Sequence, residues 1–148
     1  MKITSIAFGE GKSIPDKFSK YGANRIPPLH IEGIPRQARS LALIMDDPDA
    51  PNGTFTHWLV ANIAPETTDI EENTEPSGIV QGINDYGKNS YGGPKPPSGT
   101  HRYFFKFYAL DTVLELAEGF SRVELERQIN KHCIESGTLM AMYTHSGD

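Results

Sequence analysis

Asp47, Asp49 and His57 stand close together in the run MDDPDAPNGTFTHWLV, residues 45–60, between two stretches that are otherwise apolar. Asp47 and Asp49 follow the first stretch, and His57 lies near the start of the second. A carboxylate at such a place can accept a ring N–H, which fixes the tautomer of an imidazole and favours its charged form. A second histidine, His101, opens a later strand-like run. Two imidazolium rings, at His57 and His101, would together attract an anion.

Simpler explanations account for the same residues equally well. Asp47-Pro48-Asp49 is typical of an Asx turn, His57 would serve as a hydrogen-bonded core histidine, and His101 as an exposed strand end. Two histidines and two aspartates also suit a metal such as zinc, so a metal-dependent hydrolase is the rival function. The chain has no H-x-H, H-E-x-x-H, G-x-S-x-G or P-loop pattern. We therefore expect no catalytic motif and no cofactor.

The apolar stretches predict the strands that would position these side chains. Residues 40–46 form a short apolar run, which is typical of a strand buried on both faces. Residues 55–63 follow a reversal at Asn52-Gly53, so the two strands should be antiparallel neighbours. A third strand is expected at residues 101–110, HRYFFKFYAL. The residues that share one face of it are His101, Tyr103, Phe105, Phe107 and Ala109.

The remaining segments predict two loops and one helix. Residues 65–78 are acidic and indicate a solvated loop, whereas the glycine- and proline-rich residues 82–99 contain two tyrosines and indicate a functional loop. The capping box Ser121-x-x-Glu124 predicts the start of a helix. The helix is expected to stop at Gly137. Its apolar stripe should consist of Val123 or Leu125 with Ile129 and Cys133. A last strand is expected at 139–144.

Composition and charge narrow the class of protein. The 148 residues include 14 glycines and 11 prolines, which favours one β-rich, loop-rich domain. A net charge of −5 without a basic stripe argues against nucleic acid as a partner. No segment approaches the ~20 apolar residues of a membrane span, and the first residues lack a signal-peptide run. With a single cysteine, expected to be buried on the helix, the chain suits a reducing cytoplasm.

Four motifs follow one another along the chain: DPDAP at 47–51, HWLV at 57–60, YGGP at 91–94 and GTHRY at 99–103. In order and spacing they resemble the phosphatidylethanolamine-binding protein family, also known as Raf kinase inhibitor-like proteins, and most closely its short prokaryotic branch. The resemblance covers nearly the whole chain, from IPPL at 26–29 to YALD at 108–111. One departure is Ser19-Lys20-Tyr21-Gly22, where many relatives have Thr-Cys-Asp-Gly.

The resemblance implies a mainly β fold, with a central antiparallel sheet, a second smaller sheet, a peripheral C-terminal helix and an anion pocket at one end. Family members bind phosphate-bearing groups and modulate kinases or proteases, and no settled reaction accompanies the fold. We therefore expect a non-enzymatic binding protein for phosphate, carried by a phospholipid headgroup or a phosphorylated protein, with a kinase or protease as the candidate protein partner. A homodimer is also expected, but no stable membrane association. The residues carried over by motif are Asp47, Asp49, Pro51, His57, Gly93, Pro94, His101 and Tyr103.

Overall fold

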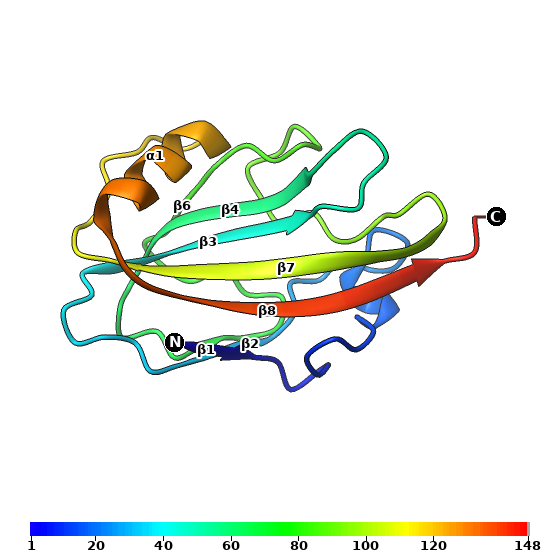
Figure 1. The fold of residues 1–148 in the computed structure, drawn as a ribbon, viewed down its shortest axis with the longest axis horizontal. Helices are drawn as coiled ribbons and strands as arrows, with labels where there is room; N and C mark the ends of the chain where they lie inside the picture. Colours follow the sequence, from blue (N-terminus) through cyan, green and yellow to red (C-terminus); the bar gives the residue numbers. More distant parts are fainter. Residues whose placement is uncertain (148) are drawn as a thin grey trace.

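The computed structural model describes residues 1–147, which form two antiparallel sheets and one α-helix (Figure 1). The larger sheet has the strand order β6 (Val80–Gln81), β4 (Phe55–Ile63), β3 (Ser40–Asp47), β7 (Gly99–Leu110) and β8 (Cys133–His145). The smaller sheet has the order β1 (Lys2–Thr4), β2 (Leu29–Glu32) and β5 (Asp69–Ile70). The helix α1 is Arg122–His132, and a 3-10 turn, η1, is Asp16–Phe18. The expected mainly β fold with two sheets and a peripheral helix is confirmed.

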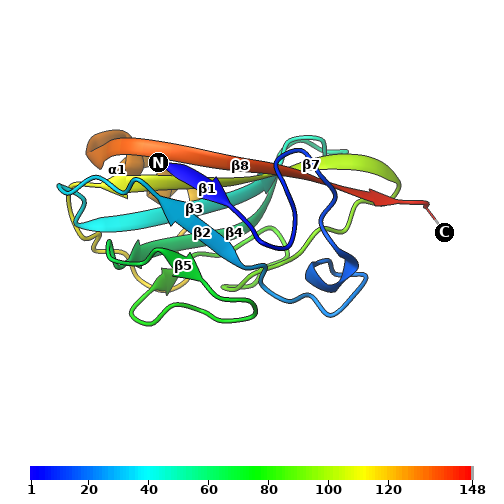
Figure 2. The same ribbon diagram turned by 90° about the horizontal axis from the view of Figure 1, so that it is seen from below.

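The elements form three layers with the larger sheet in the middle (Figures 1 and 2). Helix α1 covers one face of this sheet, and the smaller sheet covers the other. Strand β3 lies at the centre, where Leu41 and Leu43 join the core beneath the smaller sheet. Ala42 and Ile44 join the core beneath the helix. Burial on both faces explains why β3 is a continuous apolar run rather than an alternating one.

Strand β7 has the face pattern expected from its sequence. His101, Tyr103 and Phe105 are buried on one face, while Arg102 on the other face is exposed. The strand pairs with β3 so that Asp46 lies opposite Phe104. This register brings the beginning of β7 next to the end of β3, and β4 begins at the same edge of the sheet. The three strand ends therefore meet at one place.

An irregularity in β4 decides which way His57 points. Strands β3 and β4 pair Met45 with Trp58 but Asp46 with Thr56, so β4 contains one extra residue at His57. Under strict alternation, His57 would share the helix-facing side with Leu59. The bulge turns the His57 ring to the opposite face, where it packs near Tyr103.

The capping box that predicts the start of α1 is confirmed. The Ser121 hydroxyl accepts a hydrogen bond from the Glu124 N–H, and the Glu124 carboxylate accepts one from the Ser121 N–H. Leu125 and Ile129 are buried against the sheet, so they form the apolar stripe, whereas Val123 is 61% exposed.

The expected end of the helix is wrong. The helix ends at His132, and Cys133 has extended backbone angles and begins β8 opposite Leu110. Cys133 is exposed, so the expectation of a buried cysteine on the helix is also wrong. Pairing with β7 extends the last strand back to Cys133 and replaces the final helical turn. Gly137 lies within β8, where a Cβ atom would be 2.5 Å from the Met1 carbonyl oxygen.

Residues 65–78 are not entirely a solvated loop, because they contain β5, in which Ile70 is buried and pairs with Leu29. Residues 82–98 carry no strand and connect β6 to β7 over the end of the sheet, as expected of an irregular loop. No helix in the described part of the chain is long and apolar enough to cross a membrane.

Candidate functional site

A cavity of about 460 Å³ lies where the ends of β3, β4 and β7 meet. Its walls come from these strand ends, from the turn after β3 and from the loop before β7. Five of the eight residues predicted for the site line this cavity, although they are far apart in the sequence. These five are Asp47, Pro51, His57, His101 and Tyr103.

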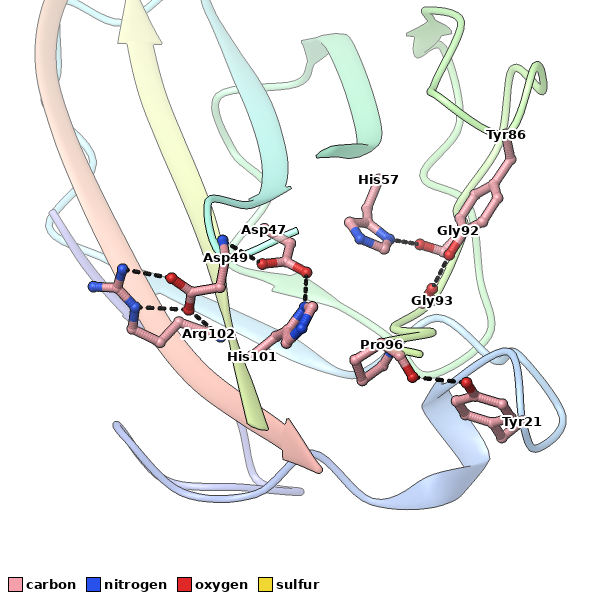
Figure 3. A network of polar contacts seen from close by, with 10 residues as sticks. All are labelled: Tyr21, Asp47, Asp49, His57, Tyr86, Gly92, Gly93, Pro96, His101 and Arg102. Atoms are coloured by element: carbon pink, nitrogen blue, oxygen red, sulfur yellow. Dashed lines mark hydrogen bonds and ion pairs between the residues drawn. The ribbon is translucent and has the colours of Figure 1, made fainter. Parts of the chain in front are cut away.

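Asp47 and His101 form a buried ion pair in the wall of the cavity (Figure 3). The distance from His101 Nδ1 to Asp47 Oδ2 is 2.6 Å. The other carboxylate oxygen of Asp47 accepts the backbone N–H of Asp49 at 2.7 Å. Asp47 therefore makes both the Asx turn and the contact to a site histidine. The two interpretations of this motif are compatible.

His57 is held differently from His101. Its Nδ1 lies 2.7 Å from the carbonyl oxygen of Gly92, and a carbonyl only accepts, so this ring nitrogen carries the hydrogen (Figure 3). The residue is 2% exposed. Burial lowers the pKa of His57, which favours the neutral ring. The geometry therefore favours a neutral ring at His57 rather than the expected imidazolium, because His57 lacks a carboxylate partner in direct contact.

Aromatic side chains surround the His57 ring. The ring centroids of Phe55, Tyr86 and Tyr103 lie 4.8, 5.6 and 5.3 Å from that of His57. Phe55 and Tyr86 also line the cavity, and sequence reasoning did not assign either to the site. The signal for Tyr86 was its presence in a long glycine- and proline-rich loop, where a side chain of this size indicates packing. For Phe55 there was no comparable signal.

The hydroxyl of Tyr103 is buried and has no hydrogen-bond partner within residues 1–147. By contrast, the hydroxyl of Tyr86 donates to the Gly93 carbonyl oxygen at 2.9 Å. Burial, and next the negative charge of Asp47, raise the pKa of Tyr103, so its hydroxyl keeps its hydrogen at neutral pH. The cavity wall therefore contains an O–H group that is available to a ligand.

Asp49 does not line the cavity. Its carboxylate accepts two hydrogen bonds from the Arg102 guanidinium, at 2.9 and 2.8 Å, and one from the Arg102 backbone N–H (Figure 3). The hydrogen bonds from Arg102 lower the pKa of Asp49 to about 2. Asp49 thus ties the turn after β3 to the start of β7.

Gly93 and Pro94 also lie outside the cavity lining and position the loop before β7. The Gly93 N–H donates to Asn24 Oδ1 at 2.7 Å, and the Pro94 carbonyl accepts the Lys20 N–H at 2.9 Å. A Cβ atom at Gly93 would lie 2.2 Å from the Phe18 carbonyl oxygen, which no side chain could tolerate without a backbone shift. The glycine therefore permits a close approach of two loops.

The segment 19–22, where the sequence departs from the common family pattern, supports the same loop. The Tyr21 hydroxyl donates to the Pro96 carbonyl at 2.7 Å (Figure 3). The Lys20 ammonium lies 4.0 Å from the centre of the Tyr86 ring. Both contacts reach residues of the cavity wall, so side chains of this segment help to hold the site in place.

The described residues do not gather the ligands that the rival metal site would need. No group of three or more His, Cys, Asp or Glu side chains within residues 1–147 is arranged to hold a metal ion. Asp49 is occupied by Arg102, and the Nδ1 atoms of His57 and His101 already have partners.

Comparison with known proteins agrees with the fold and the motifs. The family model for phosphatidylethanolamine-binding protein matches residues 4–144. A protein of Methanothermobacter thermautotrophicus named UPF0098 protein is 45% identical, over 97% of this chain and 98% of its own length. A UPF0098 protein of Pyrococcus horikoshii is 46% identical, over 97% of this chain and 76% of its own length.

Two crystal structures have the same fold. A homolog of phosphatidylethanolamine-binding protein from Chlamydia trachomatis superposes with a TM-score of 0.93 at 39% identity, over 98% of this chain and 97% of the other. Escherichia coli YbcL, described as a member of the mammalian family, superposes with a TM-score of 0.91 at 28% identity, over 98% of both chains. The matches extend over nearly the whole sequence, and the chain therefore belongs to the phosphatidylethanolamine-binding protein family.

Proposed function

We propose that the protein binds a small oxyanion, such as a phosphate group, in the cavity at the ends of β3, β4 and β7. The observation that carries this proposal is the buried ion pair between Asp47 and His101. The carboxylate accepts the hydrogen of His101 Nδ1, fixes the orientation of the ring and offsets a positive charge on it. Nε2 of His101 then donates a charge-assisted hydrogen bond to an anion.

The size and composition of the cavity support a ligand larger than a bare ion. Small-molecule sites have volumes of about 300–1,000 Å³, and this cavity is about 460 Å³. Beyond the ion pair, its walls include Pro51, Phe55 and Pro96, which would contact the carbon atoms of a phosphate-bearing molecule. Lys95, an exposed residue of the loop before β7, also lines the cavity and adds a positive charge near the anion.

Replacement of His101 tests this proposal. In the His101→Ala variant, the affinity for inorganic phosphate at pH 6.5 should fall about ten- to hundredfold, because a hydrogen bond to a charged group contributes roughly 1.5–3 kcal/mol. Isothermal titration calorimetry measures the affinity. The His101→Gln variant should also bind weakly, and it leaves Asp47 with an N–H partner if the alanine variant does not fold.

His132→Ala is the matched control, because His132 is also paired with an aspartate, Asp111, at 2.9 Å but on the exposed surface. Its phosphate affinity should equal that of the wild type. Circular dichroism checks the fold of every variant. Wild-type affinity in a folded His101 variant would show that the anion does not bind at this ion pair.

A further inference from the structure

We infer that the preferred ligand is a phosphate monoester that brings its own hydrogen into the cavity and donates it in a hydrogen bond to Nε2 of His57. This inference rests on the proposed function, because it concerns the same cavity. It divides phosphate-bearing molecules into two classes: monoesters, which can carry a P–OH group, and diesters such as common phospholipid headgroups, which cannot.

The first step concerns the tautomer of His57. Because Nδ1 donates to the Gly92 carbonyl, Nε2 is the only ring nitrogen left for a ligand. In the neutral ring this nitrogen has a lone pair and no hydrogen, so it accepts and does not donate. Burial of His57, which is 2% exposed, lowers its pKa and so favours the neutral ring.

Within residues 1–147, no group packed around His57 makes a hydrogen bond to its Nε2. Asp47 faces it from β3, Tyr103 and His101 from β7, and Tyr86 from the loop before β7. None of them makes a hydrogen bond to Nε2, although the ring lines the cavity. Two of them, Asp47 and His101, are paired with each other. An acceptor therefore faces the space where the ligand would bind.

The second step concerns the donors in the same wall. The Tyr103 hydroxyl is buried without a partner and can donate to an oxyanion. His101 donates through Nε2 when it is protonated. The wall therefore offers donors for unprotonated phosphate oxygens and one acceptor, at His57, for a P–OH group. A ligand oxygen without a hydrogen would instead place its own lone pair against that of His57 Nε2, and the two acceptors would repel each other.

The third step concerns which anions carry this hydrogen. A phosphate monoester has a second pKa near 6, so its monoanion, which keeps one hydrogen, is well populated close to neutral pH. A sulfate ester or a phosphate diester is a monoanion with no hydrogen on its oxygens.

Methyl phosphate and methyl sulfate form a matched pair for testing the inference. At pH 6.0 about half of the methyl phosphate is the monoanion, which has nearly the shape and the same charge as methyl sulfate but one additional hydrogen. Calorimetric titration measures the affinity for each ligand. After correction for the fraction present as the monoanion, methyl phosphate should bind at least about tenfold more tightly than methyl sulfate, since an unpaired buried acceptor is costly. Dimethyl phosphate, a diester, should bind as weakly as methyl sulfate.

The protonation state of His57 provides an independent readout. In ¹⁵N-histidine NMR, with the His57→Gln variant used for assignment, the ring should remain the neutral Nδ1–H tautomer when methyl phosphate is bound. Equal affinity for all three ligands, or an imidazolium at His57 in the methyl phosphate complex, would overturn the inference while leaving oxyanion binding intact. A wild-type protein that binds none of the three would overturn the proposed function itself.

Discussion

The hydroxyl of Tyr103 illustrates how one atom of the site is maintained at the expense of stability. Burying a hydroxyl without a hydrogen bond costs about 1–3 kcal/mol. Tyr103 is 0% exposed, and its hydroxyl has no partner in the described part of the chain, although a phenylalanine would fill the same space. The proposed function accounts for a tyrosine at this position, since a bound oxyanion would supply the missing partner.

Removing only this oxygen separates its role in binding from its role in folding. The Tyr103→Phe variant should be as stable as the wild type or more stable, by up to about 1 kcal/mol, because no hydrogen bond in the free protein is lost. Its affinity for phosphate should fall about three- to tenfold. Urea unfolding and calorimetry measure the two quantities.

Tyr143→Phe is the corresponding control. The Tyr143 hydroxyl donates to Asp16 at 2.7 Å and accepts from Ser19 at 3.2 Å. Its removal should lower the free energy of unfolding by about 1 kcal/mol and leave phosphate affinity unchanged. A Tyr103→Phe variant that loses stability like this control, with unchanged affinity, would assign Tyr103 a purely structural role.

At the scale of elements, local sequence patterns were enough to predict the main strands and the start of the helix. Strands β3, β4 and β7 and the start of α1 all follow from apolar runs, face alternation and a capping box. The bulge at His57 could not be predicted in this way, because it is a property of the pairing between β3 and β4. The end of α1 was missed for a similar reason, since pairing with β7 takes Cys133 into β8.

The prediction of the site residues was limited in a similar way. The motifs identified five side chains that line the cavity, but they also included Asp49, Gly93 and Pro94, which hold the surrounding turns and loops. Sequence order cannot distinguish a residue that touches the cavity from one that supports it. Phe55 was missed because an aromatic residue at the start of a strand is ordinarily interpreted as core.

Adjacent aspartates at the end of β3 serve opposite faces of the sheet. Asp47 faces the cavity, whereas Asp46, which is 1% exposed, contacts Lys106 at 3.0 Å and Arg122 at 2.8 Å on the helix side. Arg122 also donates to the hydroxyl of Thr56, the residue before His57. This cluster fixes the first turn of α1 to β3 and β4, two of the three strands that carry the site.

Breaking this cluster should be costly. Arg122→Met leaves Asp46 with one cationic partner in a buried setting, so the free energy of unfolding should fall by roughly 2–4 kcal/mol. Arg102→Met, which breaks the more exposed pair with Asp49, should cost only about 0–1 kcal/mol. Urea unfolding of both variants measures the difference. Similar losses would show that burial does not distinguish the two arginine pairs.

At the scale of the whole molecule, His57 links folding to pH. The pKa of His57 in the folded protein lies below 6.5, the ordinary value of a histidine in an unfolded chain. The unfolded chain therefore takes up more protons than the folded one as the pH falls through 6.5. The stabilisation by neutral His57 is complete above pH 6.5. It is lost as the pH falls from 6.5 to the pKa of His57 in the folded protein. His30 acts in the opposite direction, because Asp69 raises its pKa. Its contribution is present below pH 6.5 and is lost as the pH rises through its folded pKa.

These opposite signs can be tested by urea unfolding at pH 7.5, 6.5 and 5.5 in buffers without oxyanions. Between pH 7.5 and 5.5 the His57→Gln variant should lose less stability than the wild type, because it lacks the group that takes up a proton on unfolding. His30→Gln should lose more, because it lacks a group that stabilises the fold at low pH. An unchanged pH dependence in His57→Gln would contradict the neutral, buried state of this ring.

The bulge in β4 has an optical consequence. It places His57 and Trp58 on the same side of the sheet at consecutive positions, and Trp58 is the only tryptophan in the chain. The indole is fully buried, donates to Gln81 at 2.7 Å and packs edge-on against Tyr91. Its fluorescence therefore originates from one buried, hydrogen-bonded environment. Because a charged imidazole quenches indole emission more than a neutral one, we expect the fluorescence of Trp58 to respond to the protonation of its neighbour His57.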